Sequence, residues 1–398
     1  MKKFFAFFAV AAMFVACAKE SAEVPVDVTE TPVENGTEMP VLLKSNVTAS
    51  VQTKAQGGVD QWNTKQNLYI YGFQRVSTGA DYANPLIDNV LAQSPATDGS
   101  TVLNVLNSDA KPYYYEGNSI YDFYGYYVDD LYLPDNIDNY VDVRSDGIYL
   151  PIELTGGEDV MVAKADNAKD VANAKDEGQF TGDENWNDAY AYSAYAARRG
   201  VHPTLTFKHQ LVRFTFEIIS GSEFDAEDET KSLSITGLEM NARNIADLCV
   251  AGPQVGLTNI DNEKSALKLC SRGADGKLTT LTEYKVPSKE VVIENNSNVI
   301  GESLMVIPNE APAKGAIDSF GMTLYMTQAG APVKYPVDIK FTSVTGAPSG
   351  QTQFTAGYSY RIKIKVYSLE EIELSAVLEE WLSGGEISID TDDAPTIL

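Results

Sequence analysis

The sequence predicts an all-β protein built from antiparallel sheets and arranged as two tandem β-sandwich domains. Two observations carry this prediction. Aromatic strand formers are abundant, with 22 Tyr and 15 Phe, and hydrophobic residues repeatedly alternate with polar ones. Such alternation is typical of strands that bury one face. The 398 residues are enough for two or three domains with a substantial core.

Residues 1–17 predict export from the cytoplasm. Lys2 and Lys3 precede an apolar run that is too short to span a bilayer and that stops at Cys17. This order resembles a bacterial lipobox, in which the signal peptide (residues 1–16) is removed and Cys17 receives acyl chains, palmitate among them. The alternative is an ordinary signal peptide that happens to contain a cysteine.

Residues 17–38 are acidic, contain Pro and Thr and lack aromatic residues, which predicts a disordered lipidated tether. The first strand is expected directly after it, at the start of an N-terminal domain over residues 39–201. Hydrophobic or small residues of one parity define this strand: Val41, Leu43, Val47, Ala49 and Val51.

Two further segments of the N-terminal domain have distinct compositions. The tyrosine-rich stretch Tyr113 to Asp130 fits a pair of sandwich strands or, alternatively, a glycan-binding platform, because tyrosine offers an apolar face with a polar tip. We favour the strands. Residues 164–200 are rich in Ala, Asp and Lys, which predicts a long surface insertion with a helical turn.

The second domain is expected over residues 202–398. Hydrophobic parity switches between Leu211 and Val212, which predicts a bulge or a strand that changes partners. Later strands are marked by three alternating sets: Met322, Leu324 and Met326; Tyr335, Val337, Ile339 and Phe341; Tyr358, Tyr360, Ile362, Ile364 and Val366.

Charge and cysteine content limit the partners. With 30 basic and 56 acidic residues the net charge is −26, so the chain repels phosphate backbones and anionic lipid, and no nucleic-acid partner is expected. Membrane attachment is therefore expected through the Cys17 lipid. Cys249 and Cys270 either form a disulfide, closing a loop of about twenty residues, or are two unpaired buried thiols.

No motif for nucleotide, cofactor or zinc binding or for a catalytic serine is present, so we predict neither an enzyme nor a bound cofactor or metal. The only histidines, His202 and His209, lie on opposite faces of an extended segment. His209 is expected to be a hydrogen-bonded core residue. Arg144 lies between Asp142 and Asp146 where a calcium loop needs an oxygen ligand.

Several segments, in their order along the chain, resemble the fimbrillin (FimA/Mfa-type) lipoproteins of anaerobic Gram-negative bacteria. These segments are FVAC ending at residue 17, TKA at 53–55, Trp62 followed by LYIYGF, the tyrosine-rich stretch, DVMVAKAD at 159–166, LTFKHQLVRFTFEI at 205–218, LMVIPNE at 304–310, GYSYRIKIKV at 357–366 and EEWLSGG at 379–385. The resemblance implies transthyretin-like topology in both domains. It also implies an outer membrane lipoprotein that becomes part of a cell-surface fimbrium (pilus) and supports cell adhesion.

In that family a trypsin-like, often arginine-specific, protease removes the first strand, and a strand from the next subunit fills the groove. The equivalent bond here is Lys54–Ala55, with lysine in place of the arginine of the best-known members. The alternation of the first strand supports this independently, because its removal would expose an apolar groove.

The resemblance makes the C-terminal segment the candidate donor in donor-strand exchange. Its residues are Ile372, Leu374, Ala376 and Leu378, which share a parity, and Trp381, which breaks it. The alternative is that they form the last strands of the second sandwich. Strand exchange between copies makes a heterologous, non-closing interface and so a filament.

The sequence leaves three functions open. The first is a pilus subunit whose partners are other fimbrial subunits. The second is a tip or anchor lipoprotein that binds a host glycan or protein. The third is an exported enzyme, which has the least support because no catalytic constellation is visible.

Overall fold

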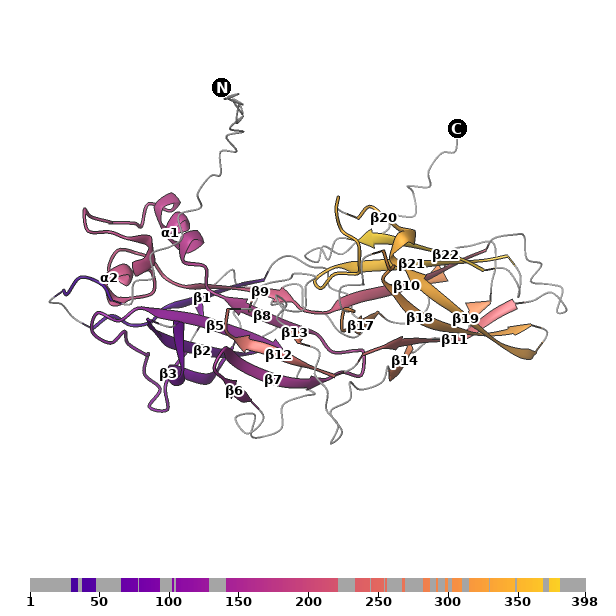
Figure 1. The fold of residues 1–398 in the computed structure, drawn as a ribbon, viewed down its shortest axis with the longest axis horizontal. Coiled ribbons are helices and arrows are strands. Elements are labelled where there is room, and N and C mark those ends of the chain that lie inside the picture. Colours follow the sequence, from indigo (N-terminus) through magenta and orange to yellow (C-terminus); the bar gives the residue numbers. More distant parts are fainter. Residues whose placement is uncertain are drawn as a thin grey trace, which may run out of the picture.

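The computed structural model describes residues 30–34, 38–47, 66–77, 79–93, 102–103, 105–128, 141–220, 233–243, 245–253, 255, 267–268, 282–286, 291–292, 298–299, 303–309, 315–328, 330–347, 349–367 and 372–379. Strands dominate, so the all-β prediction is confirmed. The strands form two lobes that lie end to end (Figure 1). No helix within these ranges is long and apolar enough to cross a membrane.

The N-terminal lobe contains a seven-stranded and a four-stranded sheet. The larger has the order β3 (Gly79–Gln93), β2 (Asn67–Val76), β5 (Tyr121–Val128), β8 (Val160–Lys164), β9 (Thr204–His209), β1 (Leu43–Val47) and β4 (Val102–Leu103). The smaller has the order β13 (Leu267–Lys268), β12 (Ile245–Ala251), β7 (Gly147–Glu153) and β6 (Asp142–Arg144).

Both faces of the seven-stranded sheet are buried. In β5, Phe123 and Tyr127 pack into one hydrophobic core with β1, β9 and the helices, whereas Tyr124 and Tyr126 pack into another with β7 and β12. All four rings are at most 3% exposed. The strand interpretation of this tyrosine-rich stretch is therefore confirmed for β5, and the rings of β5 offer no platform for a glycan.

The C-terminal lobe contains a six-stranded and a five-stranded sheet. The first comprises β16 (Asn298–Val299), β10 (Val212–Ser220), β17 (Leu304–Val306), β21 (Ser359–Val366), β22 (Ile372–Glu379) and β20 (Val344–Thr345). The second comprises β14 (Thr282–Val286), β15 (Val291–Val292), β11 (Leu233–Ala242), β18 (Ser319–Gln328) and β19 (Ala331–Lys340), which η4 (Phe341–Ser343) follows. The alternating residues predicted for β18, β19 and β21 line one shared core, as expected for facing sheets.

The parity switch marks the point where the chain changes lobes. Before it, β9 pairs with β1 and β8; after it, β10 pairs in parallel with β21. The prediction of a strand that changes partners is thus confirmed. The division into domains at residue 201 stays a prediction, and three strands beyond it, β9, β12 and β13, pair with strands of the N-terminal lobe or with each other.

The insertion forms α1 (Asn167–Asp176), η3 (Asp188–Tyr190) and α2 (Ala194–Ala197), so it is more helical than the single turn expected. Asp166 and Ser193 cap α1 and α2 by accepting backbone N–H groups through their side chains. Val171 and Tyr192 are 1% exposed and join the core of the seven-stranded sheet. The insertion therefore covers one face of that sheet, next to β1.

Candidate functional site

The first strand lies inside a sheet and not at its edge. Over Lys44–Val47, β1 runs parallel to β9, and at Leu43 and Lys44 it pairs antiparallel with the two-residue strand β4. Its hydrogen bonds therefore satisfy the backbone edge of β9. Of the predicted first-strand residues, Ala49 and Val51 and the Lys54–Ala55 bond lie outside the described residues.

The alternation predicted for this strand is found in its burial. Val41 and Leu43 are 6% and 1% exposed and belong to the core of the seven-stranded sheet, whereas Leu42 between them is 44% exposed. Ser45 continues the inward face at 2%. Val47 pairs with Phe207 through its backbone. The first strand thus fills an apolar groove between β9 and β4. We call this groove, which Val41 and Leu43 occupy, the β1 seat.

Residues before β1 are also held against the lobe. The Val41 N–H donates to the Tyr113 carbonyl at 2.7 Å, and the Thr31 N–H donates to the Asn118 carbonyl at 2.9 Å. Thr31 is 7% exposed. Residues 30–34 were expected in a disordered tether; this was wrong for these residues, because backbone pairing and an ion pair fix them.

That ion pair defines a group that we call the Glu34 clamp: Glu34, Arg198, Arg199, Asp183 and Tyr195. The Glu34 carboxylate lies 2.9 Å from Arg198 Nη1 and 2.8 Å from Arg199 Nη2. Arg199 also pairs with Asp183 at 2.6 Å and stacks 3.4 Å from the centre of the Tyr195 ring. The arginines are 25% and 12% exposed, so the clamp is partly shielded from solvent.

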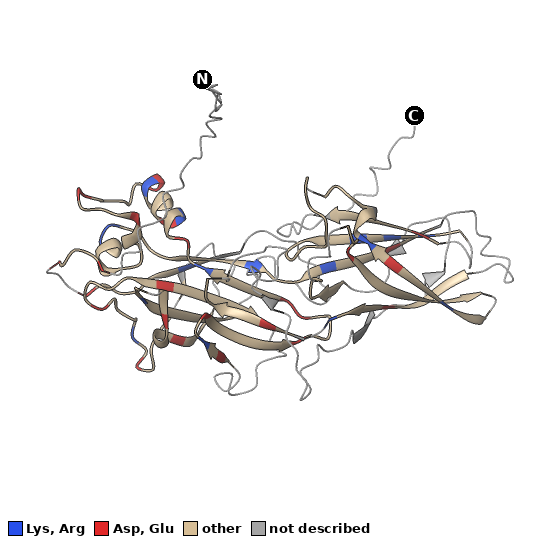
Figure 2. Ribbon diagram, viewed as in Figure 1, with Lys and Arg blue, Asp and Glu red and all other residues tan. Residues whose placement is uncertain are grey.

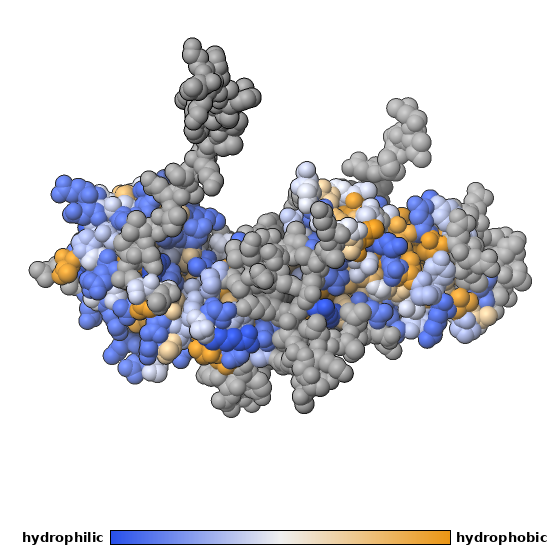
Figure 3. All heavy atoms as spheres, viewed as in Figure 1, coloured by the Kyte–Doolittle hydropathy of each residue, from blue (hydrophilic) through white to orange (hydrophobic). Residues whose placement is uncertain are grey.

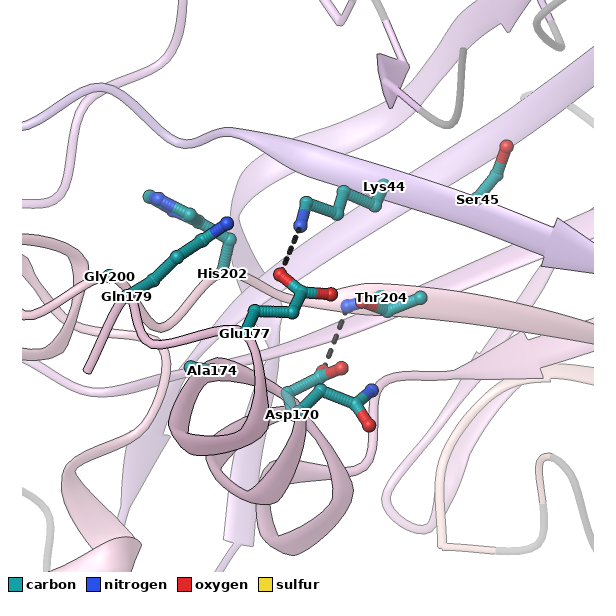
Figure 4. A pocket seen from close by; sticks show the side chains of 10 residues that line it. Lys44, Ser45, Asp170, Ala174, Glu177, Gln179, Gly200, His202 and Thr204 are labelled. Carbon is teal, nitrogen blue, oxygen red and sulfur yellow. Dashed lines mark hydrogen bonds and ion pairs between the residues drawn. The ribbon is translucent and has the colours of Figure 1, made fainter. Parts of the chain in front are cut away.

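A polar hollow of about 160 Å³ lies beside β1 (Figure 4). Lys44 from β1 reaches Glu177 at the end of α1, with 3.9 Å between Nζ and Oε2. Asp170 accepts hydrogen bonds from the Thr204 N–H at 2.8 Å and the Tyr192 hydroxyl at 2.6 Å, although burial raises its pKa. Burial and the charge of Lys44 lower the pKa of His202 on the opposite wall.

Acidification is expected to loosen residues 30–34. Burial disfavours the charge on Glu34, but hydrogen bonds from Arg199 and Arg198 and their positive charge outweigh it, so the pKa of Glu34 lies below its usual value. Because the pKa of Glu34 is lower in the folded than in the unfolded state, the ionised carboxylate stabilises the folded contact at pH values above the unfolded pKa. This stabilisation is lost as the pH falls through the folded-state pKa. Hydrogen-exchange protection factors of residues 30–34 should therefore fall at low pH.

The Glu34→Gln variant should show this low protection already at pH 7. Glu38→Gln is the matched control, because Glu38 is an exposed acid on the same segment. Equal protection of the wild type and Glu34→Gln at pH 7 would contradict the role assigned to the clamp.

The second predicted element, the C-terminal donor, lies within the sheet of its own chain. β22 pairs antiparallel with β21 along its whole length and parallel with β20 at Ala376 and Val377. Ala376 is fully buried, whereas Ile372, Leu374 and Leu378 are only partly buried against the core. Figure 3 shows hydrophobic residues gathering on this face of the C-terminal lobe, where β20–β22 lie in Figure 1. Trp381 lies outside the described residues.

The remaining predicted residues have ordinary structural surroundings. His209 is 3% exposed and its Nδ1 lies 2.8 Å from Asp159 Oδ2, which confirms a hydrogen-bonded core histidine. Arg144 forms ion pairs with Asp142 at 2.7 Å and with Asp247 at 2.8 Å. Its positively charged side chain therefore occupies the position at which a calcium loop would need an oxygen ligand. Among the described residues, no three potential metal ligands converge.

Cysteine chemistry is only partly visible. Cys249 is buried in β12, with Sγ 3.5 Å from the Ala251 carbonyl oxygen. Cys270 and the predicted lipid attachment site Cys17 lie outside the described residues, so the disulfide and the lipidation stay predictions. In Figure 2, Asp and Glu residues are spread over strands and loops of the N-terminal lobe, in line with the acidic composition.

Comparison with known proteins gives one broad match. A fimbrillin-like family model matches residues 53–381. No curated protein matches the chain. Among solved structures, a protein of Bacteroides uniformis assigned to cell adhesion is 16% identical, with 86% of this chain and 99% of that chain covered and a TM-score of 0.42.

Two fimbrial proteins of Porphyromonas gingivalis also match. The anchor protein Mfa2 is 10% identical, with 87% of this chain and 99% of that chain covered and a TM-score of 0.29. The tip protein Mfa3 is 12% identical, with 86% and 100% covered and a TM-score of 0.34. At these low TM-scores, the family assignment rests on the match over residues 53–381.

Proposed function

The chain belongs to the fimbrillin-like family of fimbrial proteins, and from this premise we propose that it is a pilus subunit that polymerises by donor-strand exchange. It is exported as an outer membrane lipoprotein through Cys17. A trypsin-like protease then cuts the Lys54–Ala55 bond, and the first strand leaves. A strand from the next subunit takes its place, and the resulting fimbrium supports cell adhesion.

The observation that carries this proposal is the position of β1 inside the seven-stranded sheet. Its departure would leave the edge of β9 without its partner along Lys44–Val47 and uncover the seat of Val41 and Leu43. An apolar groove beside an open strand edge is a template for an added strand, which supplies both the hydrogen bonds and the side chains. The seat therefore has to be refilled.

The pairing of β1 also makes it replaceable. β1 is parallel to β9 over only four residue pairs, and β4 pairs with it at two positions. Parallel pairing is slightly less stable per residue than antiparallel pairing. A longer strand that entered antiparallel to β9 would gain stability over the one it replaces.

The candidate donor is β22, whose inward residues Ile372, Leu374, Ala376 and Leu378 match the alternation of β1. Three of the four are only partly buried in their own lobe, so burial in the β1 seat of a second copy would remove further apolar area from water, at about 25 cal/mol per Å². Each copy then accepts one strand and donates another, and this arrangement extends without closing.

Lys54 provides the test of this function. We expect protein from cells to begin at Ala55 and to form heat-sensitive ladders on a detergent gel. Lys54→Ala should abolish both, because trypsin-like proteases cut after a basic residue. Lys44→Ala is the matched control, since Lys44 lies in β1 and its removal leaves the Lys54–Ala55 bond unchanged. Ladders from a chain that still begins at Cys17 would contradict the proposed cut.

One observation favours a second candidate, a fimbrial anchor or tip lipoprotein that binds a glycan or protein and keeps its first strand. The Glu34 clamp and the backbone bond from Thr31 hold the segment before β1 on the lobe. Such contacts suit a chain that remains uncut and stays tied to the membrane through its lipid. A native N-terminus at lipidated Cys17 without ladders would support this candidate.

A further inference from the structure

The Glu34 clamp and the first strand belong to the same removable segment. A cut after Lys54 detaches Glu34 together with β1, whereas Arg198, Arg199 and Asp183 stay with the lobe. The Arg198 and Arg199 guanidinium groups share the Glu34 carboxylate at 2.9 and 2.8 Å and would lose it, while Asp183 would remain beside Arg199. Paired arginines are well suited to binding a carboxylate through charge-assisted hydrogen bonds.

We propose that, after the cut, Arg198 and Arg199 bind a carboxylate of the incoming donor strand, namely Glu386 of a second copy of this chain. In the uncut chain Glu34 occupies this carboxylate site. The inference rests on the proposed strand exchange and adds to it a polar determinant that selects the donor and its direction.

Charge complementarity favours the C-terminal segment as the occupant. Residues 368–398 contain no Lys, Arg or His and nine acids: Glu370, Glu371, Glu373, Glu379, Glu380, Glu386, Asp390, Asp392 and Asp393. Binding such a segment to an acidic chain of net charge −26 needs a local cation. The arginine pair binds the leaving segment at Glu34, seven residues before Val41 (41 − 34 = 7).

The spacing along the donor selects Glu386. If the donor runs opposite to β1, its four inward residues take the seats of the first strand. The matched positions are Leu378 for Val41, Ala376 for Leu43, Leu374 for Ser45 and Ile372 for Val47. Glu386 then lies eight residues beyond Leu378 (386 − 378 = 8), against seven between Val41 and Glu34. The difference of one residue is about 3.3 Å of extended chain. Gly384 and Gly385 directly precede Glu386 and let the chain leave the strand conformation, so the Glu386 side chain is not tied to the inward face and can turn to the arginines.

The opposite direction does not provide this pairing. If the donor runs as β1 does, with Ile372 in the seat of Val41, the residue seven positions away is Lys365 (372 − 365 = 7). A lysine beside Arg198 and Arg199 is repelled. The clamp therefore favours a donor that is antiparallel to β9, which is also the more stable pairing.

The test uses the full chain, cut after Lys54 by a trypsin-like protease, with polymer growth followed by light scattering and by heat-sensitive ladders. Arg198→Gln should slow growth at least about tenfold (about 1.4 kcal/mol), because it removes a charge-assisted hydrogen bond to the donor. Glu386→Gln should slow it similarly, and both effects should shrink in high salt. Lys169→Gln, which removes an exposed positive charge from α1, is the matched control and should change nothing.

Variants that reverse the charge of each partner distinguish an effect on binding from an effect on folding. Arg198→Glu and Glu386→Arg should each block growth alone, and together in one chain they should restore it; thermal unfolding of each uncut variant reports on the fold. Undiminished growth of Arg198→Gln and Glu386→Gln would overturn the carboxylate site while leaving strand exchange intact. Faster growth of Lys365→Gln, without slowing by Glu386→Gln, would overturn the direction, because the opposite direction places Lys365 beside the arginines. A cut wild type that forms no polymer would refute the proposed function itself.

Discussion

Replacing Leu43 by Ala is expected to lower the free energy of unfolding of the uncut chain by about 2–5 kcal/mol, the usual range for truncating a buried leucine. Leu43 is 1% exposed and packs into the core beneath the seven-stranded sheet. Leu42→Ala is the matched control: the same chemical change at a side chain that is 44% exposed should cost no more than about 0.5 kcal/mol.

Urea unfolding followed by tryptophan fluorescence measures both variants. Trp186, partly buried against the same core, reports on the N-terminal lobe. If Leu43→Ala and Leu42→Ala lower the free energy of unfolding by the same amount, the inward face assigned to β1 is wrong. After cutting at Lys54 the difference should vanish, because the segment that carries both residues has left the lobe.

This pair of variants also bears on why the strand is retained before the cut. Val41, Leu43 and the backbone bonds to β9 hold the middle of the segment, whereas the Glu34 clamp holds its beginning. Weakening either should increase spontaneous exchange of the first strand. Under the proposed function both contacts are useful, because they would keep the seat filled, and the subunit unpolymerised, until a protease acts.

The sequence predicted those features that depend on local alternation. The inward face of β1, the buried faces of β18, β19 and β21, and the change of partners after Leu211 were all visible as parity, because side chains of a strand alternate between its faces. His209 was correctly assigned to the core for the same reason: it shares its parity with Leu205 and Phe207.

Pairings between distant segments could not be predicted in this way. Nothing local indicates that β1 lies parallel to β9, about 160 residues later (204 − 44 = 160), or that β12 joins β7 in the N-terminal lobe. Parity gives the face of a strand but not its neighbour. Division of the chain near residue 202 therefore did not anticipate the pairing of β9 and β12.

The Glu34 clamp was not predicted, because the composition of the segment around Glu34 is that of a disordered chain. Residues 17–38 are acidic and lack aromatic residues, which is typical of disorder. The ordering of Glu34 comes from two arginines more than 160 residues away. The one available signal was the Arg198–Arg199 pair in a chain with few basic residues, since adjacent arginines in an acidic protein call for acidic partners.

Replacing Phe214 by Ala is expected to change stability and assembly in opposite directions. Phe214 is fully buried, with ring centres 5.3, 5.2 and 5.9 Å from those of Phe320, Phe354 and Tyr360. Loss of a buried phenylalanine costs about 3–5 kcal/mol. Because β10 pairs with β21, and β21 alone holds β22 along its whole length, a weaker core should release β22 more readily.

Two measurements on Phe214→Ala follow: denaturant unfolding should show the loss of stability, and hydrogen exchange should be faster at the amides of β22. Once cut, this variant should polymerise faster than the wild type, since the donor strand must leave its own sheet before it can enter a second copy. Ile219→Ala is the matched control: Ile219 lies on the other face of β10 and is only half-buried. It should produce a smaller loss of stability and leave the exchange of β22 unchanged. Faster exchange of β22 without faster growth would mean that β22 is not the donor, and the role would pass to another strand.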